Sequence, residues 1–153
     1  MNREYSNRGS NIEVNPQDFH IETTAVIAGI TKEDGMLINE CYKRSVDTDR
    51  FIEFLQLLKK RLPKRRVALF MDNLSVHRCG RSLDEMSRLG FVAIFNTAYS
   101  PEHNPIEMIF SKVKHYFKAI KTNAIVNRQN EETKALIKRS FVNVTKGDVA
   151  NCI

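Results

Sequence analysis

The sequence predicts an α/β fold, with a mixed sheet that is flanked by helices and is parallel over its later strands. Short runs of β-branched and apolar residues alternate along the chain with longer segments whose apolar residues recur at helical spacing. The two later apolar runs, 67–71 and 91–95, are separated by a helical segment, and strand–helix–strand units form parallel sheets. With 153 residues, 42% of them hydrophobic, the chain is long enough for one domain with a buried core.

The first predicted elements are a β-hairpin and a helix. Residues 23–31 (TTAVIAGIT) and 36–43 (MLINECYK) read as strands, and the turn between them, 32–35, ends in a glycine that tolerates positive φ. A helix then begins near Asp47 or Thr48, either of which can serve as its N-cap, and a proline ends it. Its apolar residues at helical spacing are Phe51, Phe54, Leu55, Leu58 and Leu62.

Two strands and a short helix follow. The continuous apolar runs at 67–71 (VALFM) and 91–95 (FVAIF) are typical of strands buried on both faces. Between them, residues 82–89 predict a short helix. Ser82 and Glu85 stand at capping-box spacing at its start, and a glycine follows its end.

The next helix has the clearest start signal in the chain. Asn104 is a favourable N-cap, Pro105 occupies the first helical position and Glu107 the third. A last amphipathic segment covers about 131–141. The apolar stripe of the longer helix consists of Ile106, Ile109, Phe110, Val113, Phe117 and Ile120.

Composition limits the classes of function. The net charge of +6 and the pI near 9.3 permit a polyanionic partner without demonstrating one. No run of about 18 apolar residues is present, so we expect no transmembrane helix, and the polar amino terminus has no apolar core of a secretory signal. Cys41, Cys79 and Cys152 are odd in number and widely spaced, which indicates free thiols in a reducing compartment.

Two acids are predicted to lie at one rim of the sheet. Asp72 directly follows the strand at 67–71, and Glu107 lies in the first turn of the helix that follows the strand at 91–95. In an open α/β sheet, sites form beyond the carboxyl ends of the strands. Helical spacing places Ser111 and three lysines on the same flank as Glu107, and a phosphodiester substrate would require metal-binding acids followed by cations. The lysines are Lys114, Lys118 and Lys121.

Each of these residues also has a structural interpretation. Asp72 and Asn73 could form an ordinary turn after a strand, and Glu107 could serve only a capping box with Asn104. His77 could be a hydrogen-bonded loop histidine. Taken singly, the structural interpretation is the stronger one, and only the joint pattern favours a catalytic site.

The joint pattern resembles the Tc/mariner kind of DDE transposase. The segment FMDNLSVHR (70–78) resembles the region around the second catalytic aspartate of that family, and AYSPEHNPIEMIFSKVKHYFK (98–118) resembles the segment that carries its third acid. Tyr99–Pro101 and Asn104–Glu107 match the family pattern letter for letter, and 34 residues separate the two acids, as in the DD34E branch. Phe110 stands where a tryptophan is more usual.

The resemblance implies an RNase H-like fold and the cutting and joining of DNA with Mg²⁺ or Mn²⁺ as cofactor. It assigns Asp72 and Glu107 as catalytic metal ligands. Asn73 and His77 would support the site by orienting the loop or touching phosphate. The residues expected to set the approach and cap of the helix are Tyr99, Ser100, Pro101 and Asn104, and those expected to contact DNA are Lys114, Lys118, Lys121, Arg65 and Arg66.

The resemblance also implies a first aspartate on a central first strand, upstream of the stretch matched by Tyr5, Ser6 and Gly9. Upstream of Asp72, no aspartate follows a buried strand in the right place, so we expect this acid and its strand to be missing. The metal should then bind weakly, the isolated chain should catalyse little, and the sheet should be divided beside the hairpin. The aspartates considered are Asp18, Asp34, Asp47 and Asp49.

Three segments are expected: a polar arm over 1–20, a partial RNase H-like DDE catalytic domain over 21–122 and a helical extension over 123–153. The expected partners are DNA and either a second copy or the missing amino-terminal part, without a membrane. The expected location is intracellular, in the nucleus of a eukaryote or the cytoplasm or nucleoid of a bacterium. The alternative is a domesticated, non-catalytic DNA-binding or assembly protein. A junction resolvase-like nuclease is a third reading, which the 99–101 and 104–107 motifs disfavour.

Overall fold

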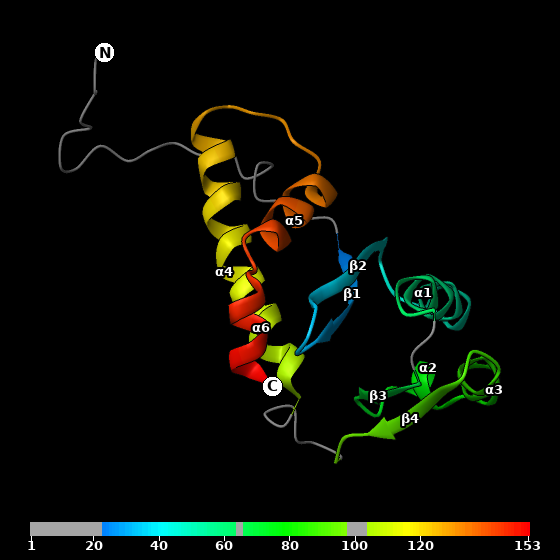
Figure 1. The fold of residues 1–153 in the computed structure, drawn as a ribbon. Coiled ribbons are helices and arrows are strands. Elements are labelled where there is room, and N and C mark those ends of the chain that lie inside the picture. The colour runs from blue at the N-terminus through cyan, green and yellow to red at the C-terminus, as the bar shows by residue number, and fades with distance from the viewer. Residues whose placement is uncertain (1–22, 64–65, 98–103) are drawn as a thin grey trace.

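The computed structural model describes residues 23–63, 66–97 and 104–153. Strands and helices alternate as the sequence predicts (Figure 1). Among the described residues, no helix combines the length and the apolar character needed to cross a membrane. The elements are β1 (Thr24–Thr31), β2 (Gly35–Lys43), α1 (Thr48–Arg61), β3 (Val67–Met71), α2 (Ser75–Arg78), α3 (Gly80–Arg88), β4 (Phe91–Phe95), α4 (Pro105–Val126), α5 (Thr133–Val142) and α6 (Lys146–Cys152).

The strands form two separate pairs. β1 and β2 are antiparallel, from Thr24 opposite Lys43 to Thr31 opposite Gly35, and the φ of +81° at Gly35 is the one that the predicted turn requires. β3 and β4 are parallel and in register. In the described part of the chain no ladder joins β1 to β3, so the expectation of a divided sheet is confirmed for these residues.

The β3–β4 pair is buried on one face only, which corrects the prediction of two buried faces. Phe70, Val92 and Ile94 are 46%, 62% and 46% exposed. The alternate residues of both strands pack against the core beneath α1 and α3. A continuous apolar run shows that a strand can be buried on both sides, but the packing of other elements decides whether it is.

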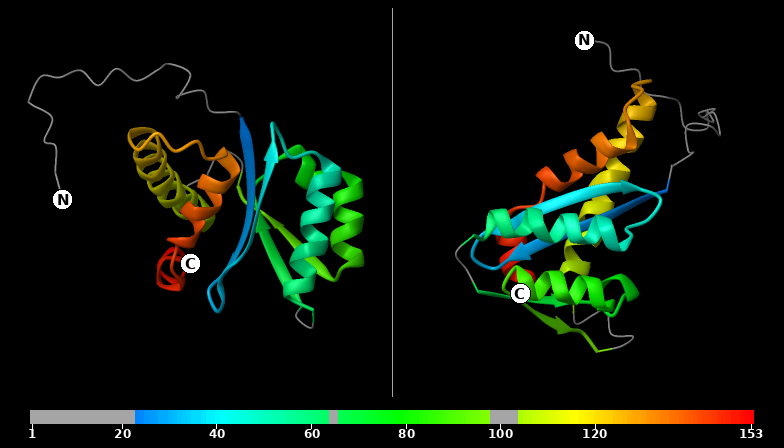
Figure 2. Two further views of the ribbon diagram at one scale, coloured as in Figure 1. Left: turned by 90° about the horizontal axis from the view of Figure 1, so that it is seen from above. Right: turned by 90° about the vertical axis from the view of Figure 1, so that its right-hand side faces the viewer.

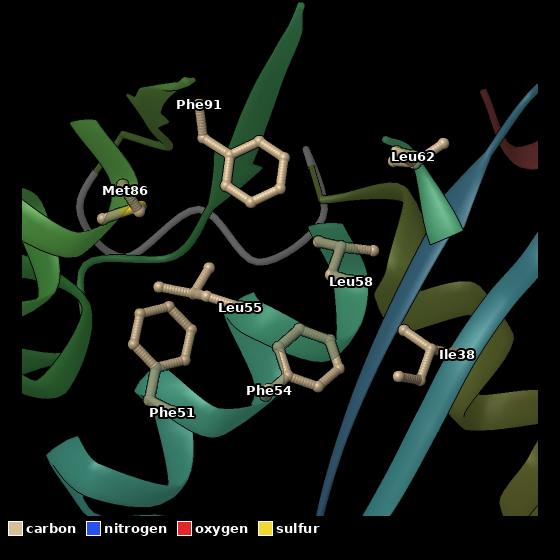
Figure 3. Packing of buried hydrophobic residues seen from close by; sticks show 8 residues of the cluster. All are labelled: Ile38, Phe51, Phe54, Leu55, Leu58, Leu62, Met86 and Phe91. Atoms are coloured by element: carbon tan, nitrogen blue, oxygen red, sulfur yellow. The ribbon is translucent and has the colours of Figure 1, made fainter. Parts of the chain in front are cut away.

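Helix α1 packs against both strand pairs. All five apolar residues of its predicted stripe are buried, and Leu55 is fully inaccessible. Figure 3 shows Ile38 of β2 beside Phe54 at one end of this cluster, with Met86 of α3 and Phe91 of β4 at the other. One hydrophobic core therefore ties the two pairs of strands to the same helix.

A second core lies on the opposite face of the β1–β2 hairpin. Helices α4, α5 and α6 cover that face, while α1 lies on the other side (Figure 2, left). The predicted boundary at 122 falls inside α4, which continues to Val126, and the predicted arm at 1–20 lies outside the described residues. The buried residues of this second core are Cys41, Ile109, Val113, Ile137, Phe141 and Val149.

The helical segment after β3 differs from its prediction. Two helices, α2 and α3, stand where one was expected, and α3 begins at Gly80. Ser82 is therefore inside the helix and does not cap it: its hydroxyl is fully buried and donates to the carbonyl of Val76 at 2.6 Å. This bond joins α2 to α3. The predicted end is confirmed, because Gly90 has a φ of +75°.

Asp148 has two roles at the start of α6: it forms an ion pair with α4, and it belongs to the capping box that begins α6. The carboxylate of Asp148 accepts a hydrogen bond from the Lys112 ammonium, and it also accepts from the backbone N–H and hydroxyl of Thr145. The Lys112 bond, followed by those of Thr145, lowers the pKa of Asp148 from 3.8 to about 2. Lys112 thus serves the fold.

Asp148→Asn is expected to lower the thermal midpoint at neutral pH, because the uncharged amide cannot replace the carboxylate. A carboxyl group whose pKa is depressed in the folded state stabilises the fold above its unfolded pKa. The difference in thermal midpoint between Asp148→Asn and the parent should therefore stay constant down to about pH 4 and disappear between about pH 4 and 2. Circular dichroism melts from pH 7 to 2 measure it. Asp49→Asn is the control, because the ion pair between Asp49 and Arg81 is exposed. Loss of an exposed ion pair should change the midpoint little. If the full difference in thermal midpoint between Asp148→Asn and its parent persists at pH 2, this account is wrong.

Candidate active site

Asp72 directly follows β3, and its carboxylate is held by a histidine. His77 Nδ1 lies 2.8 Å from Asp72 Oδ1, and the Leu74 N–H is 3.4 Å from the same oxygen. The His77 side chain is 13% exposed and its ring lies 4.5 Å from that of Phe51, whereas the Asp72 side chain is 45% exposed. The α1 core thus fixes the histidine, and the histidine fixes a carboxylate that solvent can still reach. Asp72 Oδ2 accepts no hydrogen bond from any described residue.

Asn73 joins the ends of β3 and β4. Its side-chain amide donates to the carbonyl of Asn96, while the Asn96 N–H donates to the carbonyl of Met71 at 2.7 Å. Asn96 is buried, and its side-chain oxygen accepts from the Thr97 N–H. Asn73 therefore ties the loop after β3 to the end of β4, and its role in a catalytic site stays a prediction. The sequence analysis missed Asn96, whose signal was its position as the first polar residue after the apolar run of β4.

Glu107 is exposed in the first turn of α4. Asn104 occupies the N-cap position, as predicted, and its carbonyl accepts from the Glu107 N–H at 3.0 Å. Its side chain makes no cap hydrogen bond, which corrects that part of the prediction. The structural interpretation of Glu107 as the second half of a capping box is therefore not observed.

The lysines predicted to contact DNA lie on the flank of α4 that carries Glu107. Lys114 and Lys118 are exposed and Lys121 is half-buried, while the core-facing residues of the helix lie on another side. Arg66 is exposed just before β3. Four other predicted site residues lie outside the described part of the chain: Arg65, Tyr99, Ser100 and Pro101.

The rim of the β3–β4 pair and the start of α4 lie on the same side of the molecule. The arrowhead of β4 points toward the side on which α4 begins (Figures 1 and 2). Within the described ranges, no three His, Cys, Asp or Glu side chains gather as a metal-binding group. Asp72 at the end of β3 and Glu107 in the first turn of α4 are the two carboxylates that the sequence analysis assigned to one site, and carboxylate oxygens are the ligands that Mg²⁺ and Mn²⁺ favour.

The other described aspartates considered for the first acid have different roles. Asp34 lies in the β1–β2 turn, where Thr31 contacts it. Asp47 caps α1 by accepting from the Arg50 N–H at 2.9 Å, and Asp49 pairs with Arg81 at 2.6 Å. Asp18 lies outside the described residues.

Comparison with known families settles the membership of the chain. The model of the DDE superfamily endonuclease family matches residues 1–129. The chain belongs to this DDE superfamily endonuclease family. The resemblance to Tc/mariner-type DDE transposases drawn from the 70–78 and 98–118 motifs is thereby confirmed at the level of the family.

Solved structures show the fold of this DDE family member. The Mos1 transposase catalytic domain with raltegravir and Mg is 19% identical with a TM-score of 0.66, and the match covers 84% of this chain and 67% of that one. The Mos1 strand transfer complex is 20% identical with a TM-score of 0.68, covering 99% of this chain and 45% of that one. The predicted RNase H-like fold is thus confirmed, and the chain spans less than half of the protein in that complex. No curated protein sequence matched.

Proposed function

We propose that this DDE family member carries part of a site for metal-dependent DNA strand cleavage and strand transfer, with Asp72 and Glu107 as ligands of Mg²⁺ or Mn²⁺. The observation that carries the proposal is the carboxylate of Asp72, which His77 fixes at the end of β3 while it remains open to solvent. The solved Mos1 structures support it, because they are described with Mg, with Mn and as a strand transfer complex. Because the proposed substrate is DNA, we also propose an intracellular location, in the nucleus of a eukaryote or the cytoplasm or nucleoid of a bacterium.

The residues of the site have separate tasks in this proposal. A divalent ion held there would supply Lewis-acid activation of a water or a 3′-hydroxyl and stabilisation of the leaving oxygen. Asp72 and Glu107 present the oxygen ligands, and His77 keeps the Asp72 carboxylate in one orientation. Asn73 fixes the loop by binding the end of β4. The lysines on the Glu107 flank of α4 bind phosphates along the strand.

Mn²⁺ binding tests the ligand assignment. In amide NMR spectra of the full chain, Mn²⁺ should broaden signals around Asp72 and at the start of α4. Asp72→Asn and Glu107→Gln should each weaken binding about tenfold or more, because an amide lacks the charge that the ion requires. Asp34→Asn, in the β1–β2 turn, is the matched control and should leave binding unchanged. Broadening that is centred away from Asp72 and the start of α4, or that neither substitution changes, would refute the assignment.

DNA binding is expected to depend steeply on salt and little on sequence, because lysines read phosphates and not bases. Each phosphate contact contributes about 0.9 to the slope of log K against log salt. Replacing Lys114 and Lys118 by glutamine should therefore lower that slope by about 2. The same change at Lys134 and Lys138 of α5 alters the net charge equally but should not lower the slope. Anisotropy titrations at several salt concentrations would measure both slopes.

The same titration separates the catalytic proposal from the domesticated-protein alternative, which the basic flank of α4 also favours. A strong sequence preference that survives high salt, together with no Mn²⁺ binding at Asp72 and Glu107, would favour a non-catalytic DNA-binding protein. An unchanged slope in the Lys114 and Lys118 variant would show instead that α4 does not contact the phosphates.

A further inference from the structure

Arg78 is the last residue of α2, and an aromatic ring holds its side chain at one end of the β3–β4 pair. Its guanidinium carbon lies 5.7 Å from the centre of the Phe95 ring, within the range of a cation–π interaction. Phe95 is the last residue of β4 and is paired with Met71, the last residue of β3. Because Asp72 directly follows Met71, Arg78 and Asp72 belong to the same, carboxyl end of the two strands.

The charge of Arg78 has no acidic partner within the described ranges. Its side chain is exposed, and no described acid forms an ion pair with it. A guanidinium has five N–H donors, and the attraction of an aromatic ring does not occupy them all. The Phe95 ring therefore keeps the charge in one place while donors remain open to a ligand. The described arginines that do pair with a carboxylate are Arg50, Arg81, Arg88 and Arg139.

Helix α2 holds Asp72 as well as Arg78. His77, the neighbour of Arg78 in the chain, places its Nδ1 atom 2.8 Å from Asp72 Oδ1. A guanidinium and a carboxylate that move freely at one rim attract each other, yet Arg78 and Asp72 form no ion pair. The histidine holds the carboxylate and the phenylalanine holds the guanidinium, so the two charges stay separate. The rim thus offers an anionic group to a cation and a cationic group to an anion.

We propose that Arg78 binds a phosphate group at this rim, and that the ligand is a phosphodiester of the DNA strand that reaches Asp72. Only the choice of DNA rests on the proposed function. A guanidinium fits two oxygens of one phosphate with two parallel N–H···O bonds, which a lysine ammonium cannot do. Its charge also offsets the repulsion between the Asp72 carboxylate and a phosphate. Arg78 would therefore bind DNA before any metal ion is present.

DNA binding without divalent metal tests this inference. A fluorescent DNA duplex of arbitrary sequence would be titrated with the full chain in EDTA, and its anisotropy measured at several salt concentrations. Arg78→Gln should weaken binding about tenfold at low salt, the usual cost of one charge-assisted contact. It should also lower the slope of log K against log salt by about 0.9. Arg78→Lys should keep the slope and lose only part of the affinity, because the charge stays and the paired hydrogen bonds are lost.

Arg81→Gln is the matched control for Arg78→Gln. It removes the same charge from an exposed arginine three positions further along the chain, but Asp49 lies 2.6 Å from that guanidinium and already neutralises it. The loss of this exposed pair should change the DNA affinity by about twofold or less. Equal losses in the two variants would show a general effect of net charge and would overturn the inference.

Phe95→Leu tests whether the ring positions Arg78. It keeps an apolar side chain at the end of β4 but removes the ring, so the arginine must be ordered when DNA binds. We expect binding about threefold weaker than in the parent, because ordering a side chain costs affinity. Arg78→Gln should then cost less in the Phe95→Leu background than in the parent, and fully additive losses would show that the ring does not position Arg78. Circular dichroism melts verify that each variant is folded.

Unchanged affinity and slope in Arg78→Gln would overturn the inference, and a lower thermal midpoint of that variant would show that Arg78 only covers the Phe95 ring. EDTA removes divalent ions, so the result is independent of Mn²⁺ binding at Asp72 and Glu107. Mn²⁺ binding at both acids with no effect of Arg78→Gln would refute this inference alone, and the reverse result would refute the metal site alone. If the parent binds no duplex, the proposed function fails, and the NMR signal of the Arg78 Nε–H group with inorganic phosphate decides the inference. A signal that does not shift would then overturn phosphate binding.

Discussion

Leu55→Ala is expected to lower the free energy of unfolding by about 2–5 kcal/mol, the usual cost of a large cavity in a rigid core. Leu55 is fully buried, and it lies where α1 meets Met86 of α3 and Phe91 of β4 (Figure 3). Total stabilities of single domains are about 5–15 kcal/mol, so this one change should leave a large fraction of the protein unfolded at modest urea concentrations. Urea titration followed by circular dichroism measures the change.

Leu57→Ala is the matched control for Leu55→Ala. Leu57 belongs to the same helix and loses the same atoms, but it is only partly buried at the margin of the core. Its replacement should cost about half as much or less, because less apolar surface returns to water. Equal losses at the two positions would show that α1 does not dock through the face that carries Leu55, and that the two strand pairs are not joined by this core.

Helix α1 and the β1–β2 hairpin were predicted correctly, because residues close together in the sequence specify them. The four buried residues of α1 and its buried C-cap Leu62 were predicted from their spacing alone, and the hairpin from its β-branched runs and Gly35. The single exposed face of β3 and β4 was not predictable in this way, since it depends on which elements fold over the pair. Helix α6 lies inside the predicted helical extension at 123–153 but was not predicted as a separate helix, because Val149 is its only buried residue; the capping box of Thr145 and Asp148 was a local signal for its start.

The elements that carry the candidate site residues were predictable from the sequence, but the contacts of those residues were not. Asp72 and Glu107 followed from strand ends and from the family resemblance. The bond from His77 to Asp72 depends on α2, a four-residue helix too short to show a hydrophobic period. The link from Asn73 to Asn96 depends on the parallel pairing of β3 with β4, which brings together residues 23 positions apart. Contacts of this kind require the register of the sheet, which no local pattern specifies.

The isolated chain is expected not to nick DNA in Mg²⁺ or Mn²⁺, even under conditions in which it binds both DNA and metal. Metal-assisted strand cleavage would need several carboxylate ligands, and the described residues contain no group of three His, Cys, Asp or Glu side chains that could hold a metal ion. A loss of about a thousandfold in rate corresponds to only about 4 kcal/mol of transition-state stabilisation, and the absence of a third carboxylate should cost at least that. Conversion of supercoiled plasmid to nicked circles measures the nicking rate, with Asp72→Ala assayed in parallel. Nicking that survives in Asp72→Ala would come from a contaminating nuclease. Nicking by the parent that Asp72→Ala abolishes would contradict the expectation, because the chain would then supply a third ligand of its own, and Asp18 would be the first residue to replace.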